Sequence, residues 1–405
     1  MGKLLLVNSN ADVGSTGKIC MSIADAYIER GWDVKIAYGR NKKDPTANEP
    51  LFYHITAPLN LEWHGLCTRL FDRHGFASKR ATRNFIKWAD SYDPDVLWLH
   101  NIHGYYINVE LLFDWIKSRP NMMVKWTLHD TWAFTGHCPH FAEIGCNQWQ
   151  SGCKKCPQKK EYPASLWLDN CKDNFKRKKK SFTGVNDLSI ITPSIWLSSL
   201  VKQSYLGEYS VNVINNSIDR SVFKPLSSDF RAKNGLEDKF VLLGVAYGWG
   251  RKKGLDVFIE LSQRLDERFR IVLVGTDEAA EKQLPDSIIA IRRTYDQREL
   301  AEIYSSADLF VNPTREDTFP TVNMEALSCG TPIVTFDTGG SPEIIDETCG
   351  CVVPIDDVDG MEREILRICE ERPFSTEVCE KRAELFDSFK ICNNYYEIAN
   401  VGKEK

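Results

Sequence analysis

The sequence predicts an α/β protein made of two doubly wound domains, in which helices cover both faces of a parallel sheet. Three observations predict this class: a length of 405 residues, short apolar runs that alternate with helical patterns, and a composition that changes near residue 200. A domain takes roughly 100–200 residues, so this length predicts two domains, or three. With 42% hydrophobic and 26% charged residues, the chain is globular rather than disordered, collagen-like or coiled-coil.

The first half alternates strand and helix patterns. Residues 3–8 form a short apolar run typical of a buried parallel strand, and apolar spacing over 19–30 predicts the helix that follows. Gly31 ends that helix and residues 34–37 form the next strand, which completes a βαβ unit. The other strands expected in this half are 95–100, 124–129 and, as the last, 189–193.

The second half repeats the alternation after a polar turn cluster at 215–219, which predicts a linker. The strands expected here are 240–246, 270–275, 288–291, 309–311 and 332–336, and the helices are 255–265, 299–307 and 324–328. In doubly wound sheets, ligands bind beyond the carboxyl ends of the strands. The motifs described below all lie at such ends.

Charge and patterning exclude several classes of protein. A net charge of −5 argues against a nucleic-acid binder. No apolar run approaches the roughly 18 residues of a membrane span, and the opening run is too short for a signal peptide. We therefore expect a cytoplasmic protein, with the inner face of the membrane as the more specific alternative. The loop 14–18 lacks Walker spacing and no G-x-G-x-x-G follows the first strand, which argues against a P-loop enzyme and a dehydrogenase.

The richest segment spans residues 315–332 and holds two carboxylates, Asp317 in a loop and Glu325 in the first turns of a helix. Carboxylates accept hydrogen bonds from vicinal sugar hydroxyls. Loop amides and a helix N-terminus hold phosphate. The combination suits a sugar nucleotide, whereas a pair of acids taken alone is more often a solvated surface.

This segment resembles the E-x7-E signature of retaining glycosyltransferases of family 4, which have the GT-B fold of two Rossmann-like domains facing a central cleft. Asp317 stands where the first Glu is usual, while Glu325 and the run 330–332 match closely. The resemblance implies that Asp317 acts catalytically at the donor sugar and that Glu325 holds the ribose hydroxyls. It also implies donor contacts from the loop residues Thr318, Phe319, Pro320 and Thr321.

Two further loops are similar to donor-binding loops of this family. Residues 249–256 resemble its "R…KG(L/V)D" stretch, whose basic residues hold the diphosphate; Lys253 matches, and Arg251 or Lys252 must replace the usual Arg. Cations there would stabilise the leaving diphosphate as it forms. Gly14 and Gly17 resemble a glycine loop beside the donor phosphates. A solvated basic loop and an ordinary turn are the structural alternatives.

Histidines follow two neighbouring strands of the first half. His129 and Asp130 follow one strand, and His100 and His103 follow the other. The position of His129 matches a family histidine that contacts the donor sugar, so the resemblance implies catalytic roles for His129 and Asp130 and acceptor-side roles for His100 and His103. Packed structural histidines are the alternative. Without a convincing protein nucleophile, the resemblance implies front-face substitution, in which the leaving phosphate takes the acceptor proton.

A cysteine-rich insertion is expected over 136–160. Cys138, Cys146, Cys153 and Cys156 follow the pattern C-x7-C-x6-C-x2-C, and the last pair has zinc-knuckle spacing. A structural zinc, unliganded thiols and disulfides remain as alternatives. Two histidines, His137 and His140, are alternative zinc ligands. No catalytic metal is expected.

The resemblance thus implies a retaining, hexosyltransferase-type enzyme of bacterial polysaccharide biosynthesis. A UDP-, GDP- or ADP-linked donor and a saccharide or lipid-linked saccharide acceptor are its expected partners. Acceptor binding is expected in domain 1–215 and donor binding in 216–380, with a helix over 381–405 crossing back. A GT-B-type sugar-nucleotide epimerase and a non-catalytic sugar- or nucleotide-binding protein are the alternatives. The basic run 176–180 predicts peripheral membrane association, or simply a solvated helix face.

Overall fold

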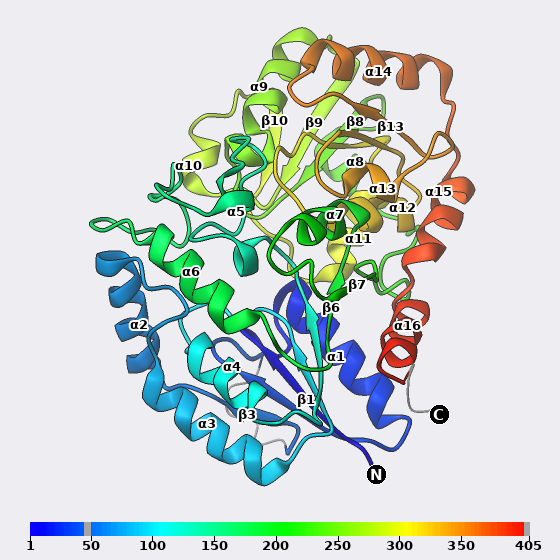
Figure 1. The fold of residues 1–405 in the computed structure, drawn as a ribbon. Coiled ribbons are helices and arrows are strands. Elements are labelled where there is room, and N and C mark those ends of the chain that lie inside the picture. The colour runs from blue at the N-terminus through cyan, green and yellow to red at the C-terminus, as the bar shows by residue number, and fades with distance from the viewer. Residues whose placement is uncertain (44–49, 401–405) are drawn as a thin grey trace. The chain divides into compact units, whose positions relative to one another are not determined.

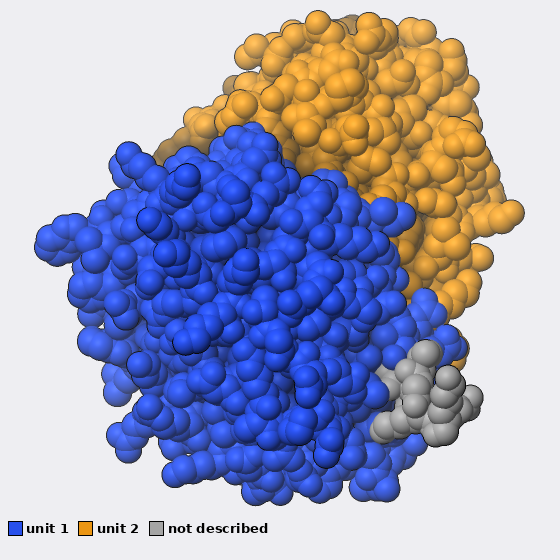
Figure 2. All heavy atoms as spheres, in the orientation of Figure 1, with its two compact units in different colours: residues 1–214, 392–405 blue, residues 215–391 orange. Residues whose placement is uncertain are grey.

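The computed structural model describes residues 1–43 and 50–400, the side chains of 399 and 400 excepted. The chain divides into two compact units (Figure 2). The N-terminal unit comprises residues 1–214 and 392–405, and the C-terminal unit comprises residues 215–391. The last five residues of the predicted helix 381–405 lie outside the described part of the chain.

Among the described residues, the centre of the N-terminal unit is a seven-stranded parallel sheet with the strand order β3-β2-β1-β4-β5-β6-β7 (Figure 1). Its strands are β1 (Lys3–Asn8), β2 (Asp33–Tyr38), β3 (Phe52–His54), β4 (Val96–Leu99), β5 (Met123–Thr127), β6 (Leu188–Thr192) and β7 (Ser210–Val213). Its helices are α1 (Gly14–Ile28), α2 (Pro58–Phe71), α3 (Lys79–Tyr92), α4 (Val109–Lys117), α5 (Gln148–Ser151), α6 (Cys171–Phe182) and α7 (Ile195–Gln203), with a 3-10 turn η1 (Trp132–Phe134).

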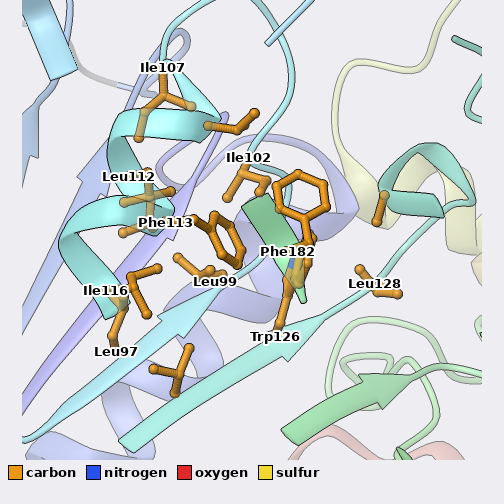
Figure 3. Close-up of a cluster of buried hydrophobic side chains, with 14 of the residues drawn as sticks. Leu97, Leu99, Ile102, Ile107, Leu112, Phe113, Ile116, Trp126, Leu128 and Phe182 are labelled. Carbon is orange, nitrogen blue, oxygen red and sulfur yellow. The ribbon is translucent and has the colours of Figure 1, made fainter. Parts of the chain in front are cut away.

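Apolar side chains fill the space between this sheet and its helices (Figure 3). Leu97 and Leu99 of β4 and Trp126 of β5 meet Phe113 of α4 and Phe182 of α6, and all five are essentially inaccessible to solvent. The rings of Trp126 and Phe182 stack edge to face at 5.0 Å. Such burial stabilises each large side chain by roughly 1.5–3 kcal/mol. It fixes the strands whose carboxyl ends carry the histidines.

The C-terminal unit has a six-stranded parallel sheet among its described residues, in the order β10-β9-β8-β11-β12-β13. Its strands are β8 (Phe240–Val245), β9 (Phe269–Val274), β10 (Ile288–Ile291), β11 (Leu309–Asn312), β12 (Ile333–Phe336) and β13 (Gly350–Val353). Its helices are α8 (Phe230–Asn234), α9 (Leu255–Arg264), α10 (Glu278–Glu281), α11 (Gln297–Ser305), α12 (Thr321–Ser328), α13 (Ser341–Ile344), α14 (Val358–Glu371) and α15 (Thr376–Ala383), with 3-10 turns η2 (Arg251–Lys253) and η3 (Glu384–Phe386).

The final helix, α16 (Ser388–Asn400), starts in the C-terminal unit and ends in the N-terminal unit. Its later residues belong to the core of the N-terminal unit. Tyr395 is 2% exposed and its ring lies 5.4 Å from that of Trp98 on β4, while Tyr396 packs edge to face on Tyr27 at 5.0 Å. The N-terminal unit is therefore assembled from two separate stretches of chain.

Two parallel α/β sheets confirm the predicted fold class, but several element boundaries differ. The first helix begins at Gly14 rather than Ile19, so the predicted glycine loop is its first turn. Residues 189–193 are not the last strand of the first half, because β7 follows and pairs in parallel with β6. The predicted helix 324–328 begins earlier, at Thr321.

Candidate functional site

The donor-site loops predicted in the C-terminal unit follow two strands that are neighbours in the sheet, β8 and β11, and the loop after the next strand, β12, lies beside them. Lys253 lies in the turn η2 after β8, Asp317 lies in the loop after β11, and Gly339 lies in the loop after β12. Parallel strands place all their carboxyl ends at one edge of a sheet. The sequence motifs are therefore brought to a single edge of this unit.

Two lysines neutralise two adjacent acids at this edge. Lys253 Nζ lies 2.9 Å from Asp317 Oδ2, and Lys252 Nζ lies 3.1 Å from Glu316 Oε2. The Glu316 side chain is only 4% exposed, whereas those of Asp317 and Lys253 are 24% and 31% exposed. Because the Lys253–Asp317 pair is partly open to solvent, an incoming phosphate or sugar hydroxyl can reach it.

Arg315 holds these loops together, a role that the sequence motif did not reveal. Its guanidinium is buried and donates to Asp256 Oδ1 at 2.8 Å and to Asp356 Oδ1 at 2.6 Å, and it also donates to the carbonyl of Arg251. Bidentate and charge-assisted bonds of this kind fix geometry more firmly than single neutral bonds. Arg315 thus ties the loop of Asp317 to the turn that carries Lys253.

The loop after β12 touches the Asp317 loop so closely that only glycine fits. A Cβ on Gly339 would lie 1.7 Å from the carbonyl oxygen of Asp317, and the residue has a φ of +55°. Both facts exclude larger side chains. Gly339 therefore packs directly against the loop of the candidate catalytic acid Asp317.

Glu325 lies in the second turn of α12, where a buried tyrosine orients it. The hydroxyl of Tyr304, on α11, donates to Glu325 Oε2 at 3.1 Å. The Tyr304 ring is inaccessible to solvent, whereas Glu325 is partly exposed. Within the described chain, no side chain caps the start of α12, although the amide of Asn323 donates to the carbonyl of Pro320 at 3.3 Å. The start of a helix with no side-chain cap can bind an anion. Tyr304 is a site residue that sequence reasoning missed.

Most of the other donor-site residues predicted from the sequence are buried or form ion pairs within the protein. Thr318, Phe319 and Pro320 are buried, and the Phe319 ring packs 5.8 Å from that of Phe386 in the hydrophobic core. These residues shape the loop. Arg251 pairs with Asp256 at 3.3 Å. Donor contacts by these residues and by Thr321 stay predictions.

The N-terminal unit brings its own predicted residues to the carboxyl edge of neighbouring strands β1, β4 and β5. Gly14 and Gly17 lie in the first turn of α1 after β1, while His100 and His129 follow β4 and β5. The two imidazoles are stacked, and His100 Nδ1 lies 3.1 Å from His129 Nε2. Burial lowers the pKa of His129 to about 4, although the nearby carboxylate opposes this shift. The pair is neutral at pH 7, since burial also holds the pKa of His100 well below its usual value.

His103 and Asp130 form a second pair beside the first. His103 Nε2 lies 2.8 Å from Asp130 Oδ2, and the other oxygen of that carboxylate accepts from the amide of Trp132 at 2.9 Å. Burial would raise the pKa of Asp130, but His103 and the Trp132 amide lower it to about 2. Asp130 is therefore an ionised carboxylate, and its partner is His103 rather than the adjacent His129.

The basic run 176–180 is not a uniform charged face, in contrast to the expectation from sequence. Lys178 is 1% exposed; its ammonium donates to the carbonyls of Trp132 at 2.8 Å and Thr135 at 3.2 Å. Burial lowers its pKa to about 7. Arg177 forms an ion pair with Glu110 at 2.7 Å. The run therefore anchors the chain after Asp130, and only its remaining three lysines point to solvent.

The four cysteines of the insertion line one pocket, together with His137 and Trp149. None of them is in a disulfide, which removes that alternative for this structure. The Cys153 sulfur accepts from the amide of Gly136 at 3.2 Å, and His137 is engaged by Asp72 at 2.6 Å. The donor chemistry suits zinc, but no group of three or more ligands among residues 1–43 and 50–400 is placed to hold a metal ion. Structural zinc stays a prediction, which metal analysis of the purified protein decides.

Comparison with known proteins gives a family match that lies within the C-terminal unit. Residues 237–371 match the family model described as Glycosyl transferases group 1. The putative colanic acid biosynthesis glycosyl transferase WcaC of Escherichia coli is 23% identical over 368 residues, which is 88% of each chain. A D-inositol 3-phosphate glycosyltransferase of Mycolicibacterium smegmatis is 24% identical over 201 residues, which is 46% of each chain.

Solved structures share the whole fold. Sucrose-phosphate synthase of Thermosynechococcus elongatus has a TM-score of 0.68 at 16% identity and covers 99% of this chain and 98% of its own. HepE of Anabaena, solved in complex with UDP, has a TM-score of 0.66 at 14% identity and covers 99% and 100%. The fold is GT-B, two Rossmann-like α/β domains. With the match over 237–371, the comparisons support a group 1 glycosyltransferase. In the described ranges, no helix has the length and apolar character that a bilayer crossing requires.

Proposed function

We propose that this protein is a retaining glycosyltransferase that moves a hexose from a nucleotide sugar to a saccharide or lipid-linked saccharide during polysaccharide biosynthesis. One observation carries the proposal: Lys253 and Asp317, from loops after neighbouring strands, meet at 2.9 Å. A cation beside a partly exposed carboxylate matches a donor with both phosphate charge and sugar hydroxyls. The relationship to WcaC supports the polysaccharide setting.

The proposed roles in the C-terminal unit follow the charges described above. Lys253 neutralises the diphosphate as the bond from the sugar C1 to the phosphate oxygen breaks, and the neighbouring Lys252 adds a second positive charge to the same turn. Glu325, oriented by Tyr304, holds the ribose hydroxyls. Asp317 accepts from the sugar hydroxyls. A uridine donor is the first to test, because HepE was solved with UDP and with UDP-glucose.

The N-terminal unit supplies the proposed acceptor side. Asp130, ionised and held by His103, accepts from an acceptor hydroxyl, while neutral His129 donates or accepts at the donor sugar. We propose front-face substitution: the acceptor oxygen forms its bond to C1 on the side that the diphosphate leaves. The departing phosphate oxygen takes the acceptor proton. This balances the reaction without a protein nucleophile.

Calorimetry with UDP, GDP and ADP tests the donor half of the proposal. Glu325→Ala should weaken binding of the preferred nucleotide by at least about thirtyfold, because it removes charge-assisted hydrogen bonds. Tyr304→Phe, which keeps the ring and removes the hydroxyl that orients Glu325, should weaken it by roughly tenfold. The control Glu347→Ala changes an exposed acid of the same unit and should leave affinity unchanged.

The competing functions predict different outcomes. If none of the three nucleotides binds the natural chain, a non-catalytic protein with another ligand is the better interpretation. An epimer formed from the donor alone, without acceptor, would favour the epimerase. Inversion at C1 of the transferred sugar, read by proton NMR of the product, would contradict front-face substitution while leaving the transferase function intact.

A further inference from the structure

The N-terminal unit exposes a row of apolar side chains on α2, away from the residues assigned above. Leu59, Trp63 and Leu66 are 79%, 58% and 47% exposed. Their spacing of four and three residues places them on one face of the helix. The opposite face is anchored inward by His64 and Thr68, both inaccessible to solvent. The outward face of α2 is therefore apolar where a surface helix is normally polar.

A second exposed apolar segment continues this row. Leu166, Trp167 and Leu168, in the loop before α6, are 70%, 75% and 45% exposed. Backbone amides attach this loop to the end of α2: Leu166 donates to the carbonyl of Arg69 at 2.8 Å, and Leu168 donates to that of Leu70 at 3.4 Å. Figure 1 shows α2 and the start of α6 on the same side of this unit. We call these six side chains of α2 and the loop the apolar patch.

Hydrogen bonds hold the loop in this outward conformation. The amide of Ser165 donates to the carbonyl of Lys159 at 2.8 Å, and its hydroxyl donates to the carbonyl of Leu168 at 2.6 Å. The ammonium of Lys159 donates to the carbonyl of Trp167 at 3.0 Å. Isolated exposed apolar residues are ordinary, but a contiguous and fixed patch marks an interaction surface.

The charges around the apolar patch identify its partner. Four basic residues lie along these two stretches of chain, against three acids that are at least partly exposed, Glu62, Glu161 and Asp169: Arg69, Arg73, Lys159 and Lys160. Within residues 1–43 and 50–400, none of these four forms an ion pair with an acid, although the Lys159 ammonium donates to the Trp167 carbonyl. The whole chain has a net charge of −5, so this local positive excess runs against the overall balance. Exposed tryptophan and leucine bordered by unpaired lysines suit an anionic lipid surface.

The segment that leads into the loop of the apolar patch contacts residues beside the predicted acceptor residues. Tyr162, 45% exposed, packs edge to face against His74 at 5.7 Å, and His74 lies 5.6 Å from the ring of His103. A chain of ring contacts thus runs from Tyr162, four residues before Leu166, to His103 and its partner Asp130 within one unit. A lipid-linked acceptor on the surface would have its saccharide end close to His103.

We propose that the apolar patch docks the N-terminal unit onto an anionic lipid bilayer. The leucines and tryptophans of α2 and of the loop enter the interface, and the surrounding lysines and arginines contact the lipid phosphates. The benefit of docking, access to a lipid-linked acceptor, rests on the proposed function. Binding to the bilayer itself requires neither donor nor acceptor.

Vesicle co-sedimentation at physiological salt tests this inference. The natural chain should bind vesicles of phosphatidylglycerol and phosphatidylcholine and should not bind phosphatidylcholine alone. Leu166→Ser combined with Trp167→Ser should lower the partition coefficient by at least about tenfold. Arg69→Ala combined with Lys160→Ala, which removes two exposed charges and leaves Lys159 to hold the loop, should lower it similarly, and more strongly at low salt. The control Tyr295→Ser with Leu385→Ser removes exposed apolar side chains from the other unit and should bind as the natural chain does.

Each outcome of these experiments either supports or overturns the docking inference. Equal binding by the two patch variants and the natural chain, or no binding of anionic vesicles by the natural chain, overturns the inference. A dimer seen by analytical ultracentrifugation, abolished by the patch variants and without vesicle binding, also overturns it and assigns the patch to self-association. Transfer to a water-soluble acceptor is measured in parallel. If transfer persists without vesicle binding, only the docking inference fails; if vesicles bind without transfer, only the proposed function fails.

Discussion

At the scale of single residues, the two units use charge in opposite ways. In the C-terminal unit, Lys253 and Asp317 are left partly exposed, so a ligand can exchange with either partner. In the N-terminal unit, burial keeps His100 and His129 neutral while Asp130 retains its charge. Neutral imidazoles can donate and accept hydrogen bonds at a sugar, whereas a buried carboxylate is a strong acceptor.

Lys253 gives the most direct test at this scale. Lys253→Met should lower kcat/KM by at least about a hundredfold, because the developing diphosphate charge loses its cation and Asp317 loses its partner. Steady-state transfer rates with the preferred donor measure this. Lys282→Met is the matched control: it removes a lysine of the same unit that pairs at 2.8 Å with Glu278 on α10. Equal effects of the two substitutions would remove Lys253 from the site.

At the scale of elements, we expect the loops after β8, β11 and β12 to move together, because a buried side chain and a close backbone contact join them. Arg315 links the first two loops through its buried guanidinium. Gly339 joins the third, at a separation that leaves no space for a Cβ. Strain or displacement in one loop must therefore move the others.

Gly339→Ala tests this coupling. The added Cβ would meet the Asp317 carbonyl, so the loop must shift and transfer activity should fall by about tenfold or more. Gly235→Ala is the matched control, since Gly235 has a similar φ of +63° but no heavy atom of the described chain within 4 Å of the place where its Cβ would lie. Gly235→Ala should lose roughly 1–2 kcal/mol of unfolding free energy in urea from backbone strain. Gly339→Ala should lose more, because its Cβ also displaces the Asp317 loop. Only Gly339→Ala should lose activity, and full activity would show that the loops move independently.

The sequence predicted central strands better than edge strands. It predicted residues within contiguous motifs better than residues that contact those motifs from elsewhere in the chain. Central strands such as β1 and β4 are buried on both faces and leave continuous apolar runs. The edge strand β7, with the sequence SVNV and two exposed ends, leaves no such signal. Lys253, Asp317 and Glu325 were predicted from contiguous motifs. Tyr304 and Lys178 were missed because each acts on a residue 21 or more positions away, which only the folded chain brings into contact.

At the scale of the whole molecule, histidine and tryptophan are unevenly distributed. All eight histidines lie at or before His140, and ten of the eleven tryptophans lie at or before Trp196. Burial lowers the pKa of four of these histidines, His64, His74, His100 and His129, below the ordinary value of 6.5. The other unit contains Trp249 and no histidine. The two units should therefore respond differently to acid.

Mild acid should destabilise the N-terminal unit first. In the unfolded chain these four histidines take up protons as the pH falls below 6.5, whereas in the folded unit His129 resists until about pH 4. The folded unit therefore loses up to about 1.4 kcal/mol per pH unit for each histidine as the pH falls from 6.5 towards 4. Urea unfolding at pH 7.5 and 5.5, followed by tryptophan fluorescence, should show a lower midpoint at pH 5.5. Between these two pH values, the backbone amides of residues 237–371 should lose less protection against hydrogen exchange than those of the N-terminal unit. An equal loss in both would contradict the assignment of acid sensitivity to the N-terminal histidines.

The discontinuous make-up of the N-terminal unit bears on the order of events during synthesis. The ribosome releases residues 1–214 long before Tyr395, which covers Trp98 from the last helix. The N-terminal unit thus completes its core only after the whole C-terminal unit has been synthesised, and until then the nascent chain carries an uncovered aromatic surface for chaperones to shield.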